Sequence, residues 1–150
     1  MTPLPAIEDL QAALDGRALP GGTLRIDRHE SLIADHALRA PDRDDDLAHP
    51  LWFVIASLRG MGITVDELGD LAAKRPGDTL LLGAVTVTHD HPLHVGATYH
   101  TSARVDQVDR QRTRAGRTLD RVVVTVRVQD DSGQSHGTVT STYLFLREAG

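Results

Sequence analysis

Four imidazole side chains crowd twelve residues of this sequence, at His89, His91, His94 and His100. Imidazole nitrogens are common zinc ligands, and on a β-strand His89 and His91 would share a face. Pro92 breaks that alternation before His94, and the chain has no cysteine to complete a zinc site. We therefore expect no metal here and interpret these histidines mainly as surface turn residues.

A second concentration of reactive side chains is basic: Arg110, Arg112, Arg114, Arg117 and Arg121. Guanidinium groups bind phosphates and carboxylates through paired hydrogen bonds. The whole chain has a formal net charge of −5, so this local basic patch stands out. It could hold a phosphorylated ligand or an acidic protein surface. The alternative is an exposed hairpin that charge keeps soluble, and both interpretations stay open.

The elements that must position these residues begin with strands. From Asp78 to Glu148 apolar and polar residues alternate, which predicts four long strands, over residues 80–90, 97–108, 121–129 and 138–146. Four valines, at positions 122, 124, 126 and 128, would share one face. Asp130 to Gly133 is a strong turn sequence. Long strands accumulate twist, so we expect a curled sheet whose concave face needs a filler.

One apolar segment can supply that filler. Leu51 to Leu58 is almost wholly apolar, and it includes Trp52 and Phe53. A helix that is apolar on nearly all sides must be buried nearly all round. Gly60 and Gly62 interrupt the segment, and residues 64–67 resemble a capping box that opens a second helical stretch.

The region before this helix is less regular. We predict a short helix at residues 7–14, a break in regular structure at Pro20–Gly22, a short strand at 23–26 and a helix at 29–38. Residues 1–22 are therefore expected to be an N-terminal extension. Residues 23–150 are expected to form a single α+β domain.

Bulk properties narrow the class of protein. One domain is the natural expectation for 150 residues. The absence of cysteine excludes disulfides and fits a reducing cytosol. No apolar run approaches the roughly 20 residues needed to span a bilayer, and no signal pattern opens the chain, so we expect a cytoplasmic protein without a membrane partner. The negative charge argues against a nucleic-acid partner. The bias to arginine over lysine indicates a GC-rich bacterial genome.

Three segments carry a resemblance to a known family. They are Ala48–Trp52 at the start of the apolar helix, His91–Gly96 between two strands, and residues 121–148 with their Asp-x-x-Gly turn. In order and spacing, over residues 22–148, the chain resembles the MaoC-like dehydratases, in particular their N-terminal-type domains. That resemblance implies the hot-dog fold, in which a long curled antiparallel sheet wraps around one central helix.

The resemblance also implies a substrate and a partner. Its members add or remove water across the α–β bond of acyl thioesters of coenzyme A or acyl carrier protein, without a further cofactor. They work as dimers or double hot dogs, so we expect a homodimer or a heterodimer with another hot-dog chain, paired edge to edge. Candidate substrate contacts are Trp52, Arg110, Arg112, Arg114 and Arg117.

Hydration needs a base, an acid and donors for the enolate oxygen. The catalytic members resemble one another in an Asp-x-Asn-Pro-x-His loop, which would correspond to residues 40–50 here. This chain has no asparagine, but Asp44 and His49 keep the Asp-to-His spacing and are the candidate catalytic pair. The alternative is a solvated acidic loop in which His49 only begins the helix. The first amides of the Leu51 helix are expected to be unpaired and available to a thioester carbonyl.

Four functions remain open. The leading one is a MaoC-like hydratase or dehydratase, and the second is a non-catalytic hot-dog subunit of a heteromeric dehydratase. A hot-dog thioesterase would need a carboxylate on the central helix or an adjacent strand, and the helix acids Asp66, Glu67 and Asp70 lie too far along it. The last alternative is a cone-shaped α+β barrel isomerase or cyclase, which also places helices before a long-stranded sheet.

Overall fold

The computed structural model describes residues 2–41 and 45–149. One antiparallel sheet has the strand order β1-β3-β4-β5-β2, and its strands are β1 (Ala18–Arg25), β2 (Thr79–His89), β3 (Thr98–Arg112), β4 (Thr118–Gln129) and β5 (Ser135–Leu146). The helices are α1 (Ile7–Leu14), α2 (Arg28–Ala37), α3 (Trp52–Arg59) and α4 (Val65–Leu71). The curled sheet expected from the long alternating segments is confirmed.

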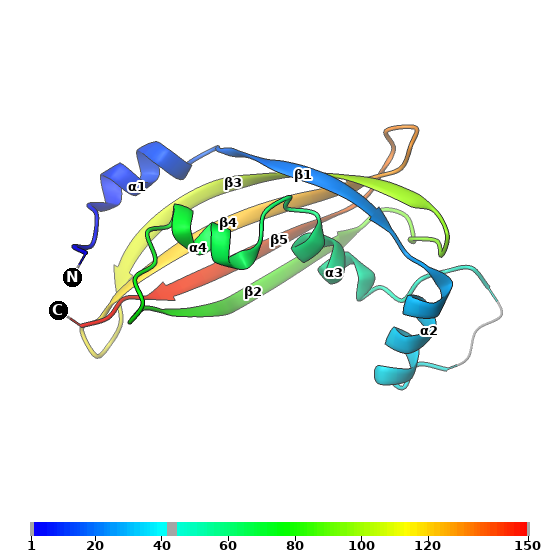
Figure 1. Cartoon of the computed structure of the whole chain (residues 1–150), viewed down its shortest axis with the longest axis horizontal. Helices are drawn as coiled ribbons and strands as arrows, with labels where there is room; N and C mark the ends of the chain where they lie inside the picture. Colours follow the sequence, from blue (N-terminus) through cyan, green and yellow to red (C-terminus); the bar gives the residue numbers. More distant parts are fainter. Residues whose placement is uncertain (1, 42–44, 150) are drawn as a thin grey trace.

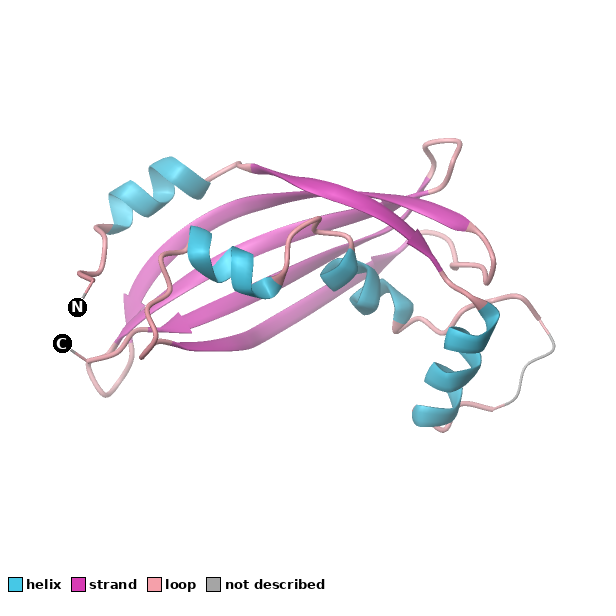
Figure 2. Ribbon diagram, in the orientation of Figure 1, coloured by secondary structure: helices cyan, strands magenta, loops and turns pink. Residues whose placement is uncertain are grey.

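The sheet curves around α3 and α4, which follow one another along its concave face (Figure 1). Helix α1 packs against β3, and α2 projects beyond one end of the sheet (Figure 2). Within the described residues no helix has both the length and the apolar character needed to cross a membrane.

Strand β4 packs one of its two faces against the core and leaves the other partly exposed. Its four even-numbered valines, from Val122 to Val128, are at most 1% exposed. Val123 and Thr125 are only partly buried, and Arg127 is exposed. This period of two is the one expected for a strand with one face on the core.

The central helical segment is divided into α3 and α4, as expected from Gly60 and Gly62. Trp52 and Phe53 of α3 are each 2% exposed, so both belong to the core. A capping box starts α4, because the Thr64 hydroxyl accepts from the Glu67 amide at 3.0 Å and the Glu67 carboxylate accepts from the Thr64 amide at 3.3 Å. The joint between the helices lies against β1, since the Gly21 amide donates to the Met61 carbonyl.

Strand β1 is longer than the sequence suggested. It starts at Ala18 rather than at Thr23, and the register shifts between Leu19 and Gly22. Gly21 adopts a φ of +68°, and a Cβ there would lie 2.4 Å from the Thr101 carbonyl oxygen. Pro20–Gly22 is therefore a bulge inside the strand and not a break in the chain. Residues 1–22 contain α1 and the first part of β1, and they contribute three leucines to the core, Leu10, Leu14 and Leu19.

Candidate functional site

A cavity of about 270 Å³ opens where the end of β2 meets the start of α3. Phe53, His89, Asp90 and His91 are among the residues that line it. The Phe53 and His89 rings pack with their centroids 4.8 Å apart. Imidazole and carboxylate groups beside an apolar wall are the side chains that general acid–base chemistry uses, so this is the best candidate site.

The wall of the cavity is fixed by backbone hydrogen bonds between segments far apart in sequence. We call residues 90–96, which follow β2, the 90–96 turn. The Ala48 amide donates to the Leu93 carbonyl at 2.8 Å, and the Val95 amide donates to the Asp46 carbonyl at 2.7 Å. The segment that leads into α3 is thus held on this turn, which supports the cavity from one side.

His49 lies at the start of α3 with one ring nitrogen already engaged. Its Nδ1 accepts a hydrogen bond from the Leu51 amide at 3.0 Å. In the neutral ring the proton then sits on Nε2, which makes that atom a donor and not a base. Asp44 lies outside the described residues, so an Asp44–His49 acid–base pair stays a prediction.

The expectation of unpaired amides at the start of α3 is wrong. The amides of Trp52, Phe53 and Val54 donate to the carbonyls three residues earlier, at 2.9, 3.1 and 2.9 Å. Because the Leu51 amide is taken by His49, a tight first turn satisfies the donors that helices usually leave open. These amides do not offer an oxyanion hole.

His136 is the buried imidazole that the sequence interpretation missed. Its Nδ1 lies 3.0 Å from the Pro92 carbonyl oxygen, and its Nε2 lies 3.1 Å from a carboxylate oxygen of Asp130. The spacing Asp-x5-His across a hairpin turn could have indicated this pair, because a turn at 130–133 returns residue 136 to the neighbourhood of residue 130.

Hydrogen bonds keep the carboxyl of Asp130 ionised. The Ser132 hydroxyl and the His136 ring lower the pKa of Asp130 most, burial opposes them, and the Gln134 and Ser132 amides lower it further. The pKa of this carboxyl therefore lies well below its ordinary value.

The four histidines singled out in the sequence make separate contacts. His89 packs on Phe53, and His91 Nε2 lies 2.9 Å from the Gln134 side-chain nitrogen. His100 pairs with Asp131 at 2.6 Å. The fourth, His94, donates its backbone amide to the Tyr99 hydroxyl at 2.7 Å. Burial raises the pKa of Tyr99 although this bond lowers it, so Tyr99 stays neutral.

The arginine-rich hairpin makes contacts within the chain. Arg110 forms two bonds to Asp120, at 2.6 and 2.9 Å. Arg112 donates to the Gly116 carbonyl and Arg117 to the Arg147 carbonyl. Arg114 is exposed. A role for these arginines in holding a phosphate or a carrier protein stays a prediction.

The arginine hairpin and the cavity lie at opposite ends of the sheet. Strand β2 places Thr79 beside Leu146, next to the hairpin end of β4, and His89 beside Gly137. Ten residues of extended strand correspond to roughly 33 Å. The two regions therefore form separate surfaces.

Trp52 does not line the cavity in this chain. It is 2% exposed, and the Arg59 guanidinium lies 5.7 Å from the centre of its ring. The α3 side chain that reaches the cavity is Phe53. A substrate contact for Trp52 stays a prediction.

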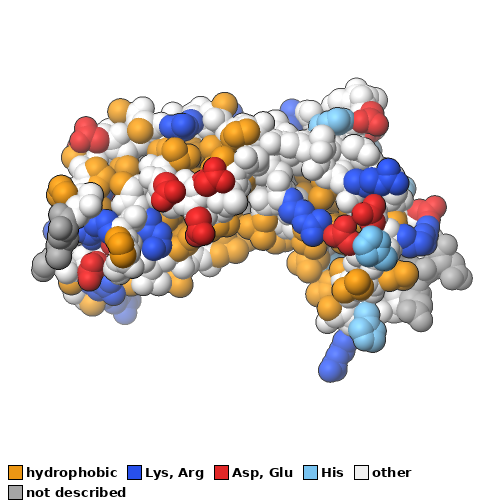
Figure 3. Space-filling model, viewed as in Figure 1, with side chains coloured by type: hydrophobic (Ala, Val, Ile, Leu, Met, Phe, Trp, Pro, Cys, Tyr) orange, Lys and Arg blue, Asp and Glu red, His pale blue; other side chains and the backbone are white. Residues whose placement is uncertain are grey.

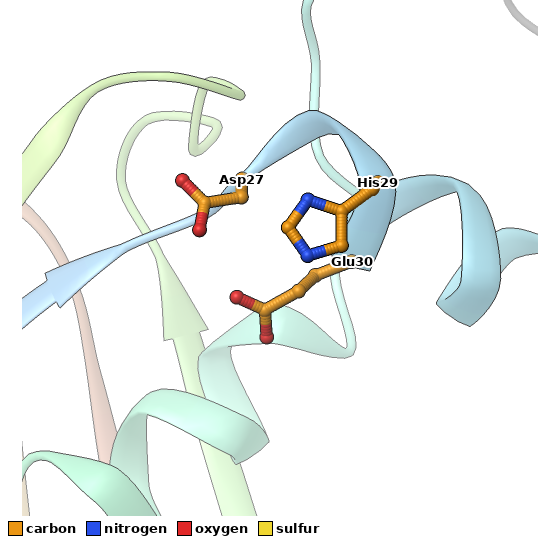
Figure 4. Close-up of side chains that lie close together, drawn as sticks. All are labelled: Asp27, His29 and Glu30. Atoms are coloured by element: carbon orange, nitrogen blue, oxygen red, sulfur yellow. The ribbon is translucent and has the colours of Figure 1, made fainter.

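Asp27, His29 and Glu30 bring their ligand atoms within 4.8 Å of one another, at the junction of β1 and α2 (Figure 4). Both carboxylates already face guanidinium groups. Asp27 lies 3.4 Å from Arg25, and Glu30 accepts two bonds from Arg59 at 3.1 Å. These pairs neutralise the acidic charge, and the second one ties α2 to α3.

This chain resembles several solved structures in fold, at sequence identities below 20%. No family model matches the sequence, and no curated protein matches it. A chain of the HadBC (3R-hydroxyacyl-ACP dehydratase) complex from Mycobacterium tuberculosis aligns with a TM-score of 0.62 at 14% identity, over 88% of this chain and 98% of that one. A MaoC-like dehydratase aligns with a TM-score of 0.66 at 17% identity, over 91% of this chain and 43% of that one.

A chain of the ChsH1–ChsH2 complex from Mycobacterium tuberculosis has a TM-score of 0.64 at 16% identity, over 96% of this chain and 90% of that one. Another similar structure is described as a hot-dog-like protein from Thermanaerovibrio acidaminovorans. The cone-shaped barrel alternative therefore has no support. The curled five-stranded sheet wrapped around α3 and α4 is the hot-dog fold, and the solved structures that resemble it include a MaoC-like dehydratase.

Proposed function

We propose that this chain is a hot-dog subunit that pairs with a second hot-dog chain in an acyl-thioester hydratase or dehydratase. The observation that carries the proposal is the uncovered surface along β2, α3 and α2. Large exposed hydrophobic side chains gather there, at Leu32, Ile33, Leu38, Leu51, Leu58, Leu81 and Leu82. Figure 3 shows hydrophobic side chains along the lower rim of the molecule and on the projecting α2.

Strand β2 has the character of an edge that another strand covers. It hydrogen-bonds to β5 on one side only. Its eleven residues, TLLLGAVTVTH, contain no proline, lysine, arginine or carboxylate. Exposed sheet edges usually carry such residues to prevent pairing. Their absence supports a partner strand on β2.

The size and lining of the candidate site also favour a site that is completed by a second chain. Its cavity of about 270 Å³ falls just below the range of roughly 300 to 1,000 Å³ typical of ligand pockets. The first amides of α3 are already paired, so the donors for an enolate must come from elsewhere. A second chain could enlarge the pocket and supply those donors. Two of the similar structures, HadBC and ChsH1–ChsH2, are described as complexes, which agrees with pairing of this chain.

Co-expression with the hot-dog chain encoded nearest to it tests the proposal. Purified alone, the chain should not hydrate crotonyl-coenzyme A, and the co-purified pair should. Hydration by the isolated chain, abolished in His49→Ala, would instead make the single chain an enzyme. Release of free thiol from acyl-coenzyme A would indicate a thioesterase. That alternative is kept because the fluoroacetyl-CoA-specific thioesterase FlK is also a structural neighbour.

A further inference from the structure

His136 sits between two groups that can only accept hydrogen bonds. The residue is 8% exposed, with Nδ1 facing the Pro92 carbonyl and Nε2 facing the Asp130 carboxylate. A carbonyl oxygen has no proton to give, and neither has an ionised carboxylate. Both contacts are hydrogen bonds only when both ring nitrogens carry protons. The positively charged ring is therefore the form that fits this pocket.

The environment of Asp130 keeps that carboxylate an acceptor. One of its oxygens accepts from the Ser132 hydroxyl at 2.6 Å, the Ser132 amide at 2.9 Å and the Gln134 amide at 3.0 Å. The other oxygen faces His136. Bonds to the ionised form favour it, in agreement with the lowered pKa of Asp130.

The remaining groups around the ring do not compete for its protons. The Tyr99 ring lies 5.1 Å away and the His91 ring 5.5 Å away, both edge-on. Tyr99 already accepts from the His94 amide, and His91 is engaged with Gln134. Among the described residues, Asp130 is the carboxylate that contacts the His136 ring.

The contact between His136 and Pro92 is connected to the candidate site by two hydrogen bonds. Pro92 and Leu93 are consecutive in the 90–96 turn, and the Leu93 carbonyl accepts from the Ala48 amide. The next residue, His49, binds the first amide of α3. The His136 backbone carbonyl also accepts from the amides of two turn residues, Asp90 and His91, each at 3.0 Å.

We infer that His136 is a positioning residue, whose doubly protonated ring clamps the 90–96 turn in the shape that forms the cavity wall. A ring with a single N–H proton keeps only one of its two contacts, so the clamp needs both protons. The clamp is a property of this chain alone, and only its role in thioester handling rests on the proposed function.

Side-chain nitrogen NMR of the wild-type chain tests the clamp without any variant. Because both ring nitrogens face acceptors, the His136 ring should show two N–H protons. A ring with a single N–H proton overturns the inference.

A pair of variants separates the clamp from general effects of histidine loss. His136→Gln offers a single donor group, so hydrogen-exchange protection of the Ala48 and Val95 amides should fall about fivefold relative to wild type after correction for intrinsic exchange. His100→Gln is the matched control, because its pair with Asp131 is exposed, and it should keep wild-type protection. Wild-type protection in His136→Gln contradicts the clamp. These measurements use no substrate or partner, so their failure leaves the proposed function untouched.

Discussion

At the scale of single residues, a buried cluster of charged side chains lies far from the candidate site. Arg147 is 1% exposed and bonds to Asp120 at 2.8 Å and Asp78 at 2.9 Å. It also donates to the Ala72 and Ala73 carbonyls that end α4. One guanidinium thus joins α4, β2, β4 and the C-terminal segment. The buried acids and Arg147 each appear in the sequence as ordinary surface charges, and only the folded chain shows their convergence.

Removing this guanidinium should take one cationic partner from each of two buried carboxylates, which keep Arg75 and Arg110. Arg147→Met is expected to lower the free energy of unfolding by about 3 to 5 kcal/mol, measured by urea denaturation. Arg104→Met is the control. Its side chain is 67% exposed and pairs with Asp106, so its loss should cost less than about 1 kcal/mol. Equal losses in the two variants would contradict a stabilising role for the buried cluster.

The same cluster sets a dependence of stability on acidity. Burial raises the pKa of Asp78, but bonds from Arg75, the Glu148 amide and Arg147 outweigh it and lower the pKa. A carboxyl with a lowered folded pKa stabilises the fold above its unfolded pKa of about 3.9, and this contribution is lost as the pH falls further. The difference in unfolding free energy between wild type and Asp78→Asn should therefore shrink below about pH 4. A difference that stays constant down to about pH 3 would argue against this linkage.

At the scale of elements, periodicity predicted most of the fold. The alternation of valines located β4, and the capping box located α4, because both depend on neighbours in sequence. The sequence predicted that strand β1 begins only at Thr23, because Pro20–Gly22 suggests a break. In the structure the glycines instead allow a bulge that lies against Thr101, so the strand continues through this segment. The cavity could not be predicted in the same way. It joins the end of β2 to the start of α3 through backbone bonds that no local pattern records.

The joint between α3 and α4 requires a glycine at position 62, because a side chain there would collide with β1. Gly62 has a φ of +77°, and a Cβ there would lie 2.3 Å from the Gly21 carbonyl oxygen. Gly16 has a similar φ of +73° but open space around it. Gly16→Ala should cost about 1 to 2 kcal/mol, and Gly62→Ala should cost roughly 1 to 3 kcal/mol more because the backbone must move. Thermal unfolding of both variants measures the difference, and equal costs would show that the contact with β1 is unimportant.

At the scale of the whole molecule, the two edges of the sheet differ in kind. The β1 edge contains a bulge, and its Gly21 amide is bonded to the α3–α4 joint. The β2 edge is long, has no acidic or basic residue other than His89, and includes Leu81 and Leu82, which are 48% and 52% exposed. Such an asymmetry suits assembly through β2 alone.

A charge placed on each edge tests this asymmetry. Leu82→Arg should convert the assembled protein to single chains, because a guanidinium would have to be buried in the new interface. Thr23→Arg, on the exposed side of β1, should leave the assembly unchanged. Light scattering after size-exclusion chromatography measures both masses. Assembly that survives Leu82→Arg, or that Thr23→Arg disrupts, would rule out β2 as the contact.

The bare β2 edge also carries a consequence for the living cell. Under the proposed pairing, a copy synthesised in excess of its partner chain would leave this edge free to pair with other extended peptides, and aggregation or degradation would follow. The amount of this chain that accumulates in the cell should then track the supply of the partner chain.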